Sequence, residues 1–338
     1  MMRCIFCSKE RPPSLEHVVP LAIGGSLTTD RVCEPCNSEL GSRVDLALTD
    51  YLPIRVRRGE LGLAGNSRKP PGRFELLTGD VELVGEAGGR LRVTYDEATN
   101  KLDLHRLYQA TDAITPDGQK IRQIVVDARD KEKVTVIINR ERKRHGMPPL
   151  SDEELAIEVS KLSVNTLVNP TVRMNICVSY AYLRHAMFKI AYELAFLWLG
   201  ESYLDDPLAA ALRTAICKPE VGSLDSFHGF VGPAADCEAF SPFWKPHQSH
   251  HLAYSQEKAG NVVIAVRIFD LYAAVVLVST DAARYFDGSN AHPTELRFVA
   301  MDAVSGNKME TTFAEEVHRI VTTWQATRTF PSPVPDLL

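Results

Sequence analysis

Four of the seven cysteines of this 338-residue chain lie in two pairs near its amino terminus. The pairs are Cys4/Cys7 and Cys33/Cys36, and each has the spacing Cys-x-x-Cys, which can place two thiolates on one tight turn. Four thiolates that meet in this way form a tetrahedral site for a structural zinc ion, and the same ligands would also bind iron. We expect zinc, because it is the commoner structural ion.

The segment between the two pairs contains side chains that can do acid–base chemistry. It is 25 residues long, which exceeds the spacing of about 15 to 20 residues typical of zinc ribbons. Glu16 and His17 lie side by side within it, and Asn37 directly follows the last cysteine. The oxygen atoms of Glu16 and Asn37 can hold a hard divalent cation, while an imidazole can take a proton from water near neutral pH.

The residues around this dipeptide predict a ββα unit. We expect a strand that ends at Pro20, a turn at Gly24-Gly25, a returning strand, and a helix that opens near Asn37. At a helix start the Asn37 side chain would be a favourable cap, which is the alternative to cation binding. Because adjacent strand residues face opposite sides, Glu16 and His17 reach one site only through a bulge or at a strand end.

The region from Cys4 to about Asp45 resembles the zinc-stabilised HNH endonucleases, which have a ββα-metal fold. The resemblance covers about an eighth of the chain. It implies that His17 is the general base, that Glu16 and Asn37 hold one catalytic magnesium or manganese ion, and that the zinc ion is structural. The motifs that carry it are Cys4-Ile5-Phe6-Cys7, Glu16-His17-Val18-Val19-Pro20, Gly24-Gly25, Cys33-Glu34-Pro35-Cys36 and Asn37.

Two further positions extend or depart from this family pattern. Thr28, nine residues before Asn37, stands where many family members have an asparagine that orients the base histidine. A threonine hydroxyl can still structure the loop by hydrogen bonding. The segment that ends at Asp45 resembles the tail of one HNH subgroup, so Asp45 is a further candidate ligand of the catalytic cation. The alternative for Asp45 is a solvated helix residue.

The distribution of charge is uneven along the chain. The net charge of −5 argues against a uniformly basic nucleic-acid coat protein, but residues 1–73 carry a net charge of +3 and the remainder −8. We predict that four arginines near the motif contact nucleic-acid phosphates, with solvated surface as the alternative. These arginines are Arg43, Arg55, Arg57 and Arg58.

The rest of the chain predicts a larger α+β body with antiparallel strands. Residues 179–199 form an apolar pattern typical of a central buried helix, in which Lys189 and Glu193 pair on a polar edge or belong to an internal ligand site. A strand is expected at 134–138 and an antiparallel hairpin at 262–279. Ser151 and Glu154 predict the capping box of a helix start.

We divide the chain into three parts. They are an HNH nuclease module with structural zinc at 1–58, a β-rich segment at 59–148, and a regulatory or target-recognition body at 149–338. The alternative is that 59–338 form one domain. The clustered cysteines and the lack of a leader or membrane segment predict a cytoplasmic protein.

The predicted function is a metal-dependent HNH endonuclease that hydrolyses phosphodiester bonds of DNA, with RNA open as a substrate. One motif makes one nick, so a double-strand break requires two copies, through a homodimer, a partner protein or successive events. The resemblance also suggests a defence effector against foreign DNA. The alternatives are a non-catalytic zinc-binding nucleic-acid or assembly module, and a nuclease gated by a ligand-sensing body.

Overall fold

The computed structural model describes the chain except for residues 66–67, 73–76, 86–87, 97, 100, 115–116, 175–179, 221, 241–242, 287–294 and 335–338. The chain forms two compact units, of which the first comprises Met1–Arg73 with Val178–Leu338, and the second Phe74–Cys177. This division differs from the expected boundaries at 58 and 148, because the amino-terminal segment shares a core with the carboxyl-terminal body. None of the helices in the described ranges is long and apolar enough to cross a bilayer.

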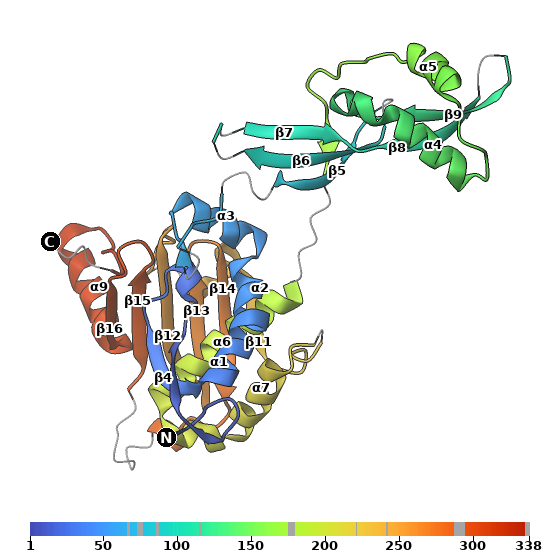
Figure 1. Cartoon of the computed structure of the whole chain (residues 1–338). Coiled ribbons are helices and arrows are strands. Elements are labelled where there is room, and N and C mark those ends of the chain that lie inside the picture. Colours follow the sequence, from blue (N-terminus) through green and yellow to red (C-terminus); the bar gives the residue numbers. More distant parts are fainter. Residues whose placement is uncertain are drawn as a thin grey trace. The chain divides into compact units, whose positions relative to one another are not determined.

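A six-stranded antiparallel sheet is the centre of the first unit (Figure 1). The hairpin expected at 262–279 is confirmed, and its two strands lie inside this sheet. The strand order is β11-β14-β13-β12-β15-β16. The strands are β11 (Gly229–Pro233), β12 (His250–Lys258), β13 (Asn261–Ile268), β14 (Tyr272–Ser279), β15 (Arg297–Asp302) and β16 (Lys308–Thr312).

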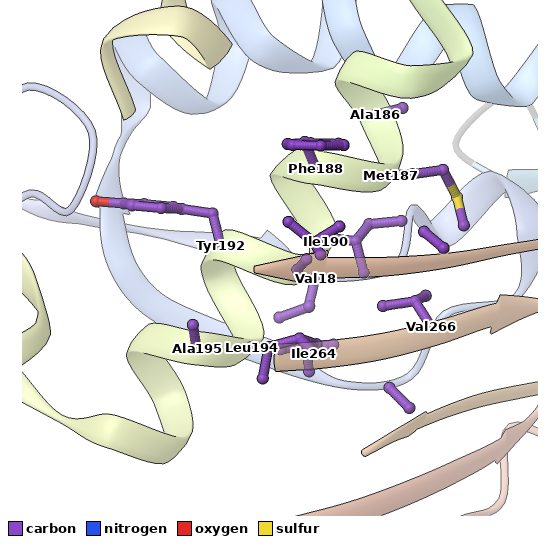
Figure 2. Close-up of a cluster of buried hydrophobic side chains, with 14 of the residues drawn as sticks. Val18, Ala186, Met187, Phe188, Ile190, Tyr192, Leu194, Ala195, Ile264 and Val266 are labelled. Carbon is purple, nitrogen blue, oxygen red and sulfur yellow. The ribbon is translucent and has the colours of Figure 1, made fainter. Parts of the chain in front are cut away.

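Helix α6 (Tyr180–Leu199) covers one face of this sheet, where it contacts β13 and β14. Most of its residues are buried, as the apolar pattern predicts. Helix α7 (Pro207–Cys217) packs beside it, and the Asp206 carboxylate caps α7 by accepting hydrogen bonds from its first backbone N–H groups. Figure 2 shows Val18 of the amino-terminal segment in one apolar cluster with side chains of α6 and β13. The cysteine-bearing segment is therefore part of the body's core.

The opposite face of the sheet has its own apolar cluster. Helix α9 (Phe313–Thr327) contributes Ile320 to it, and Trp244 stacks on Phe298 of β15. A capping box at Thr312 and Glu315 fixes the start of α9. The short helix α8 (Ala283–Phe286) follows β14. The first unit is thus a sheet covered on both faces, with α6 and the amino-terminal segment together on one of them.

The amino-terminal segment is built from small elements. Strands β3 and β4 pair antiparallel and lead directly into α1, which continues through a π-helical turn, Gly41–Asp45, into α2. Helix α2 contacts α6. The elements are β1 (Met2–Arg3), β2 (Glu10–Arg11), β3 (Pro13–His17), β4 (Thr28–Cys33), α1 (Glu34–Leu40), α2 (Leu46–Thr49) and α3 (Leu52–Glu60).

The second unit combines antiparallel strands with helices. The strand expected at 134–138 is wrong, since these residues begin α4 (Val134–Arg144), whose buried side chains Val134, Ile137 and Glu141 have helical spacing. The capping box of Ser151 and Glu154 is confirmed at α5 (Asp152–Ser160). The strands are β5 (Gly79–Leu83), β6 (Arg90–Asp96), β7 (Lys101–Arg106), β8 (Gln109–Ile114), β9 (Lys120–Val125) and β10 (Val172–Arg173).

Candidate active site

The four clustered cysteines meet at one point. Their sulfur atoms lie within 4.8 Å of one another, and the sulfur atoms of Cys7 and Cys33 are 3.7 Å apart. A tetrahedral zinc ion with Zn–S bonds of about 2.3 Å places its sulfur ligands about 3.8 Å apart, so the spacing and the donor set fit zinc. Burial raises the pKa of the Cys33 and Cys36 thiols, and a bound dication would stabilise their thiolates instead.

The dipeptide Glu16-His17 lies at the end of β3. Glu16 is opposite Thr29 and Ser14 is opposite Val32, so β4 has one residue more than β3 between these pairs. This irregularity is a β-bulge. A bulge or a strand end is the feature that the sequence analysis required for Glu16 and His17 to reach one site. Glu16 is 4% exposed, whereas His17 is half-buried and closes the strand.

Thr28 and Asn37 both contact the β3 strand near its end. Thr28 is the direct cross-strand partner of His17. The amide nitrogen of Asn37 donates hydrogen bonds to the carbonyl oxygen of Leu15 at 2.8 Å and to the hydroxyl of Ser14 at 3.1 Å. The alternative of a capping role for Asn37 is wrong, because α1 starts at Glu34 and Asn37 lies inside the helix. Its side chain instead joins α1 to β3.

Helix α6 places a lysine against the carboxylates of this segment. The Nζ atom of Lys189 lies 2.5 Å from Glu16 Oε1, and 3.0 and 2.9 Å from the two carboxylate oxygens of Asp45. Glu193 Oε1 is 3.6 Å away. The polar edge expected for Lys189 and Glu193 is wrong, because both side chains are fully buried. The available signal was a lysine between the apolar residues Phe188 and Ile190, since lysine is almost never buried unless it is paired.

The surroundings decide how these groups are charged. Burial alone would lower the pKa of Lys189, but the carboxyl groups of Asp45, Glu193 and Glu16 outweigh burial and raise it. Burial raises the pKa of Glu16, against the opposing charge of Lys189. Burial also raises the pKa of Glu193 well above its usual value, and neither oxygen of this carboxyl group has a hydrogen-bond partner among the described residues. The cluster is thus one ammonium group between Glu16 and Asp45, beside a carboxyl group of Glu193 whose burial favours its protonated form.

The three oxygen ligands expected for a catalytic cation do not form an open site. One oxygen of Glu16 and both oxygens of Asp45 face the Lys189 ammonium, and the Asn37 amide is turned to β3. Asp45 is therefore neither a free ligand nor a solvated helix residue. Within the described ranges, only the four cysteines bring three or more His, Cys, Asp or Glu side chains close enough to hold an ion. The residues present do not fit a preformed magnesium or manganese site.

A comparison with protein families identifies this region. Residues 4–53 match the HNH endonuclease family. The match starts at Cys4 and contains all the candidate residues of the zinc site, the β3 dipeptide, Asn37 and Asp45. It covers 50 of the 338 residues, so it assigns no family to the remainder. No curated protein and no solved structure gives a significant match.

The four arginines predicted to contact phosphates differ in exposure. Arg43 lies on the surface of the HNH region and pairs with Glu39, and Arg55 is half-buried. Arg57 is buried, and its guanidinium lies 2.5 Å from the Asp270 carboxylate. Arg58 is also buried and donates to the carbonyl oxygen of Thr49 at 3.1 Å. Arg57 and Arg58 therefore stabilise the packing of the first unit and present little charge to a ligand.

The Gly24-Gly25 pair of the HNH region is explained by close packing. Gly24 has a φ of +82°, and a Cβ atom there would lie 2.4 Å from the carbonyl oxygen of Ala303 in the carboxyl-terminal body. A Cβ atom on Gly25 would lie 1.8 Å from the carbonyl oxygen of Val19. Both glycines are thus needed where the turn after β3 approaches other backbone closely.

An open groove of about 510 Å³ runs beside the hairpin of the HNH region. One wall comes from Leu15 and residues 28–31, and the other from residues at the end of α6, including Phe196 and Leu197. Arg31 contributes to the groove, where it pairs with Glu201 and lies over the Phe196 ring. His17 does not line this groove, but its cross-strand partner Thr28 does.

Proposed function

We propose that this protein is an HNH-type nuclease that hydrolyses phosphodiester bonds of DNA, with His17 as the general base. The family match over residues 4–53 is the observation that carries the proposal. The position of His17 supports it, because the side chain is half-buried at a strand end next to a fixed Glu16. Burial, followed by the charge of Lys189, lowers the pKa of His17, so the imidazole is neutral and able to accept a proton at neutral pH.

In the proposed reaction His17 takes a proton from a water molecule as the water oxygen attacks phosphorus. The bond from phosphorus to the ester oxygen of the leaving strand then breaks, and that oxygen receives a proton from solvent. Thr28 and Asn37 position the strand end that carries His17. HNH endonucleases use a magnesium or manganese ion in this reaction, but we assign no step to an ion here, because Glu16 and Asp45 bind Lys189.

A second candidate function is a non-catalytic zinc-stabilised module that binds nucleic acid or assembles with a partner. The contacts of Lys189 favour it, since they occupy two carboxylates that a catalytic cation would use. Cleavage of both strands would require a dimer, a partner protein or two successive nicks. A role in defence against foreign DNA, and a body that gates the nuclease, stay predictions.

The decisive experiment is nicking of supercoiled plasmid by the zinc-loaded protein, with magnesium or manganese added, at neutral pH. Loss of a general base slows such reactions by about 10² to 10⁴-fold, so we expect this loss for His17→Ala. The matched control is His318→Ala, since His318 is exposed on α9 and should leave the rate unchanged. Equal nicking by the wild-type protein and His17→Ala, or no nicking by either with any divalent ion, would exclude the enzyme and leave the zinc module.

A further inference from the structure

We infer that Lys189 is a built-in cation of the HNH site, supplied by α6 of the carboxyl-terminal body. Its ammonium group takes the position between Glu16 and Asp45 that a divalent ion would otherwise occupy, and it holds both carboxylates in place. Lys189 is thus a positioning residue outside the matched segment 4–53. The inference extends the proposed nuclease site, but it concerns ion binding and does not depend on turnover.

The geometry uses the full donor capacity of the ammonium group. A lysine ammonium has three N–H donors, and Lys189 Nζ has three acceptors within 3.0 Å, one oxygen of Glu16 and both oxygens of Asp45. The oxygen of Glu193, at 3.6 Å, lies beyond hydrogen-bond distance. A magnesium or calcium ion needs oxygen ligands at about 2.0 to 2.6 Å, so it could not share this space with the nitrogen atom.

The packing of α6 keeps the ammonium group where it is. The side chain of Lys189 has no exposed surface, and its neighbours Phe188 and Ile190 are fully buried in the cluster shown in Figure 2. The α6 residue Tyr192 also donates a hydrogen bond to the carbonyl oxygen of Ile5, next to the zinc ligand Cys4. Lys189 can therefore leave Glu16 only if α6 separates from the HNH region, which would open the core of the unit.

The balance of charge agrees with a permanent cation. The carboxylates of Glu16 and Asp45 come from separate elements and both contact the same buried ammonium group. Their mutual repulsion must be compensated by a positive charge at this position. Lys189 supplies that compensation within the same chain. The HNH region is consequently incomplete without the carboxyl-terminal body, and two of the three expected oxygen ligands are already paired before any ion binds.

The test measures Mn²⁺ binding to the zinc-loaded, full-length protein without nucleic acid, by electron paramagnetic resonance and calorimetry. We expect the wild-type protein to have no tight Mn²⁺ site that involves Asp45. In Lys189→Met the vacated position should bind Mn²⁺ at least about tenfold more tightly, because two carboxylates then lack a counter-charge. Lys189→Arg is the matched control, since it keeps the positive charge and should gain no Mn²⁺ affinity.

Melting temperatures supply a second measurement on the same proteins. Mn²⁺ should raise the melting temperature of Lys189→Met, because an ion that binds only the folded state stabilises it, and should leave the wild-type value unchanged. Equal Mn²⁺ affinity in the wild-type protein and Lys189→Met would overturn the inference.

A further variant covers the case in which Lys189→Met does not fold. Asp45→Asn retains Lys189, and it should bind Mn²⁺ like the wild-type protein. Weaker Mn²⁺ binding by Asp45→Asn than by the wild-type protein would show that Asp45 is a free ligand and overturn the inference. Because these experiments contain no DNA, their outcome is independent of the plasmid assay for nuclease activity.

Discussion

Acidification should weaken the junction between the HNH region and the sheet through one buried histidine. His251 lies on β12 and is 1% exposed. Its Nε2 atom donates a hydrogen bond to the carbonyl oxygen of Ile23 at 2.7 Å, and its ring packs on Phe269 with centroids 4.5 Å apart. The Nδ1 atom is buried and has no hydrogen-bond partner among the residues that the structure describes. A proton on Nδ1 would therefore place an uncompensated charge in the core.

The size of the effect follows from the two pKa values. Burial lowers the pKa of His251 in the folded protein to about 4, from the ordinary value of 6.5 that applies to the unfolded chain. The unfolded chain therefore binds a proton first, and stability falls as the pH drops from about 7 towards 4. Proton linkage with these two values removes about 2 kcal/mol between pH 8 and pH 5, and about 3 kcal/mol at lower pH.

Urea unfolding monitored by tryptophan fluorescence measures this loss in the first unit. The three tryptophans of the chain, Trp198, Trp244 and Trp324, all belong to that unit. His251→Gln keeps an N–H donor for Ile23 but has no proton to gain near neutral pH. We expect the free energy of unfolding of this variant to change with pH by about 2 kcal/mol less than that of the wild-type protein between pH 8 and pH 5.

Zinc also dissociates on acidification, and the comparison of variants removes that contribution. Wild type and His251→Gln share the same four cysteines, so the loss due to zinc is equal in both. His318→Gln is the control for a surface histidine, because His318 is exposed on α9. An identical pH dependence in the wild-type protein and His251→Gln would refute the argument that buried His251 carries the loss.

Two further substitutions test the packing of the HNH region. Cys4→Ser should lose zinc and unfold this region, because binding of structural zinc contributes about 10 to 16 kcal/mol, which is comparable to the free energy of unfolding of a whole domain. Zinc content and hydrogen exchange measure the result. The control is Cys217→Ser, which lies outside the cysteine cluster and should leave the zinc bound. Gly25→Ala should lose about 3 kcal/mol or more of unfolding free energy, since its Cβ atom would lie 1.8 Å from the Val19 carbonyl oxygen. Gly41→Ala is the control: outside its own helix no described atom lies within 4 Å of the added Cβ, and φ is a helical −58°. This variant should instead gain about 0.5 to 1 kcal/mol in thermal unfolding.

Local patterns in the sequence determined the small elements around the zinc site. The Cys-x-x-Cys spacing predicts two thiolates on each turn, and the four sulfur atoms do lie together. The alternation and turn residues near Glu16 predict a strand, a glycine turn and a second strand before a helix, which are β3, β4 and α1. Apolar periodicity also predicts the buried helix α6 and the hairpin of β13 and β14. These features depend on residues close in the sequence, so a single sequence contains enough information to predict them.

Only the tertiary structure decided which distant residues share the site. Lys189 meets Glu16 and Asp45 across separations of 173 and 144 residues, and no local spacing encodes such contacts. The same holds for Arg57, whose chain position suggested a phosphate contact but whose partner Asp270 lies in the carboxyl-terminal body. A buried charge is stable only where the fold brings an opposite charge next to it. Which charges become neighbours depends on how the core packs. The sequence therefore predicted the cysteine cluster and the strand that carries His17, whereas the fold decided which side chain binds the carboxylates beside them.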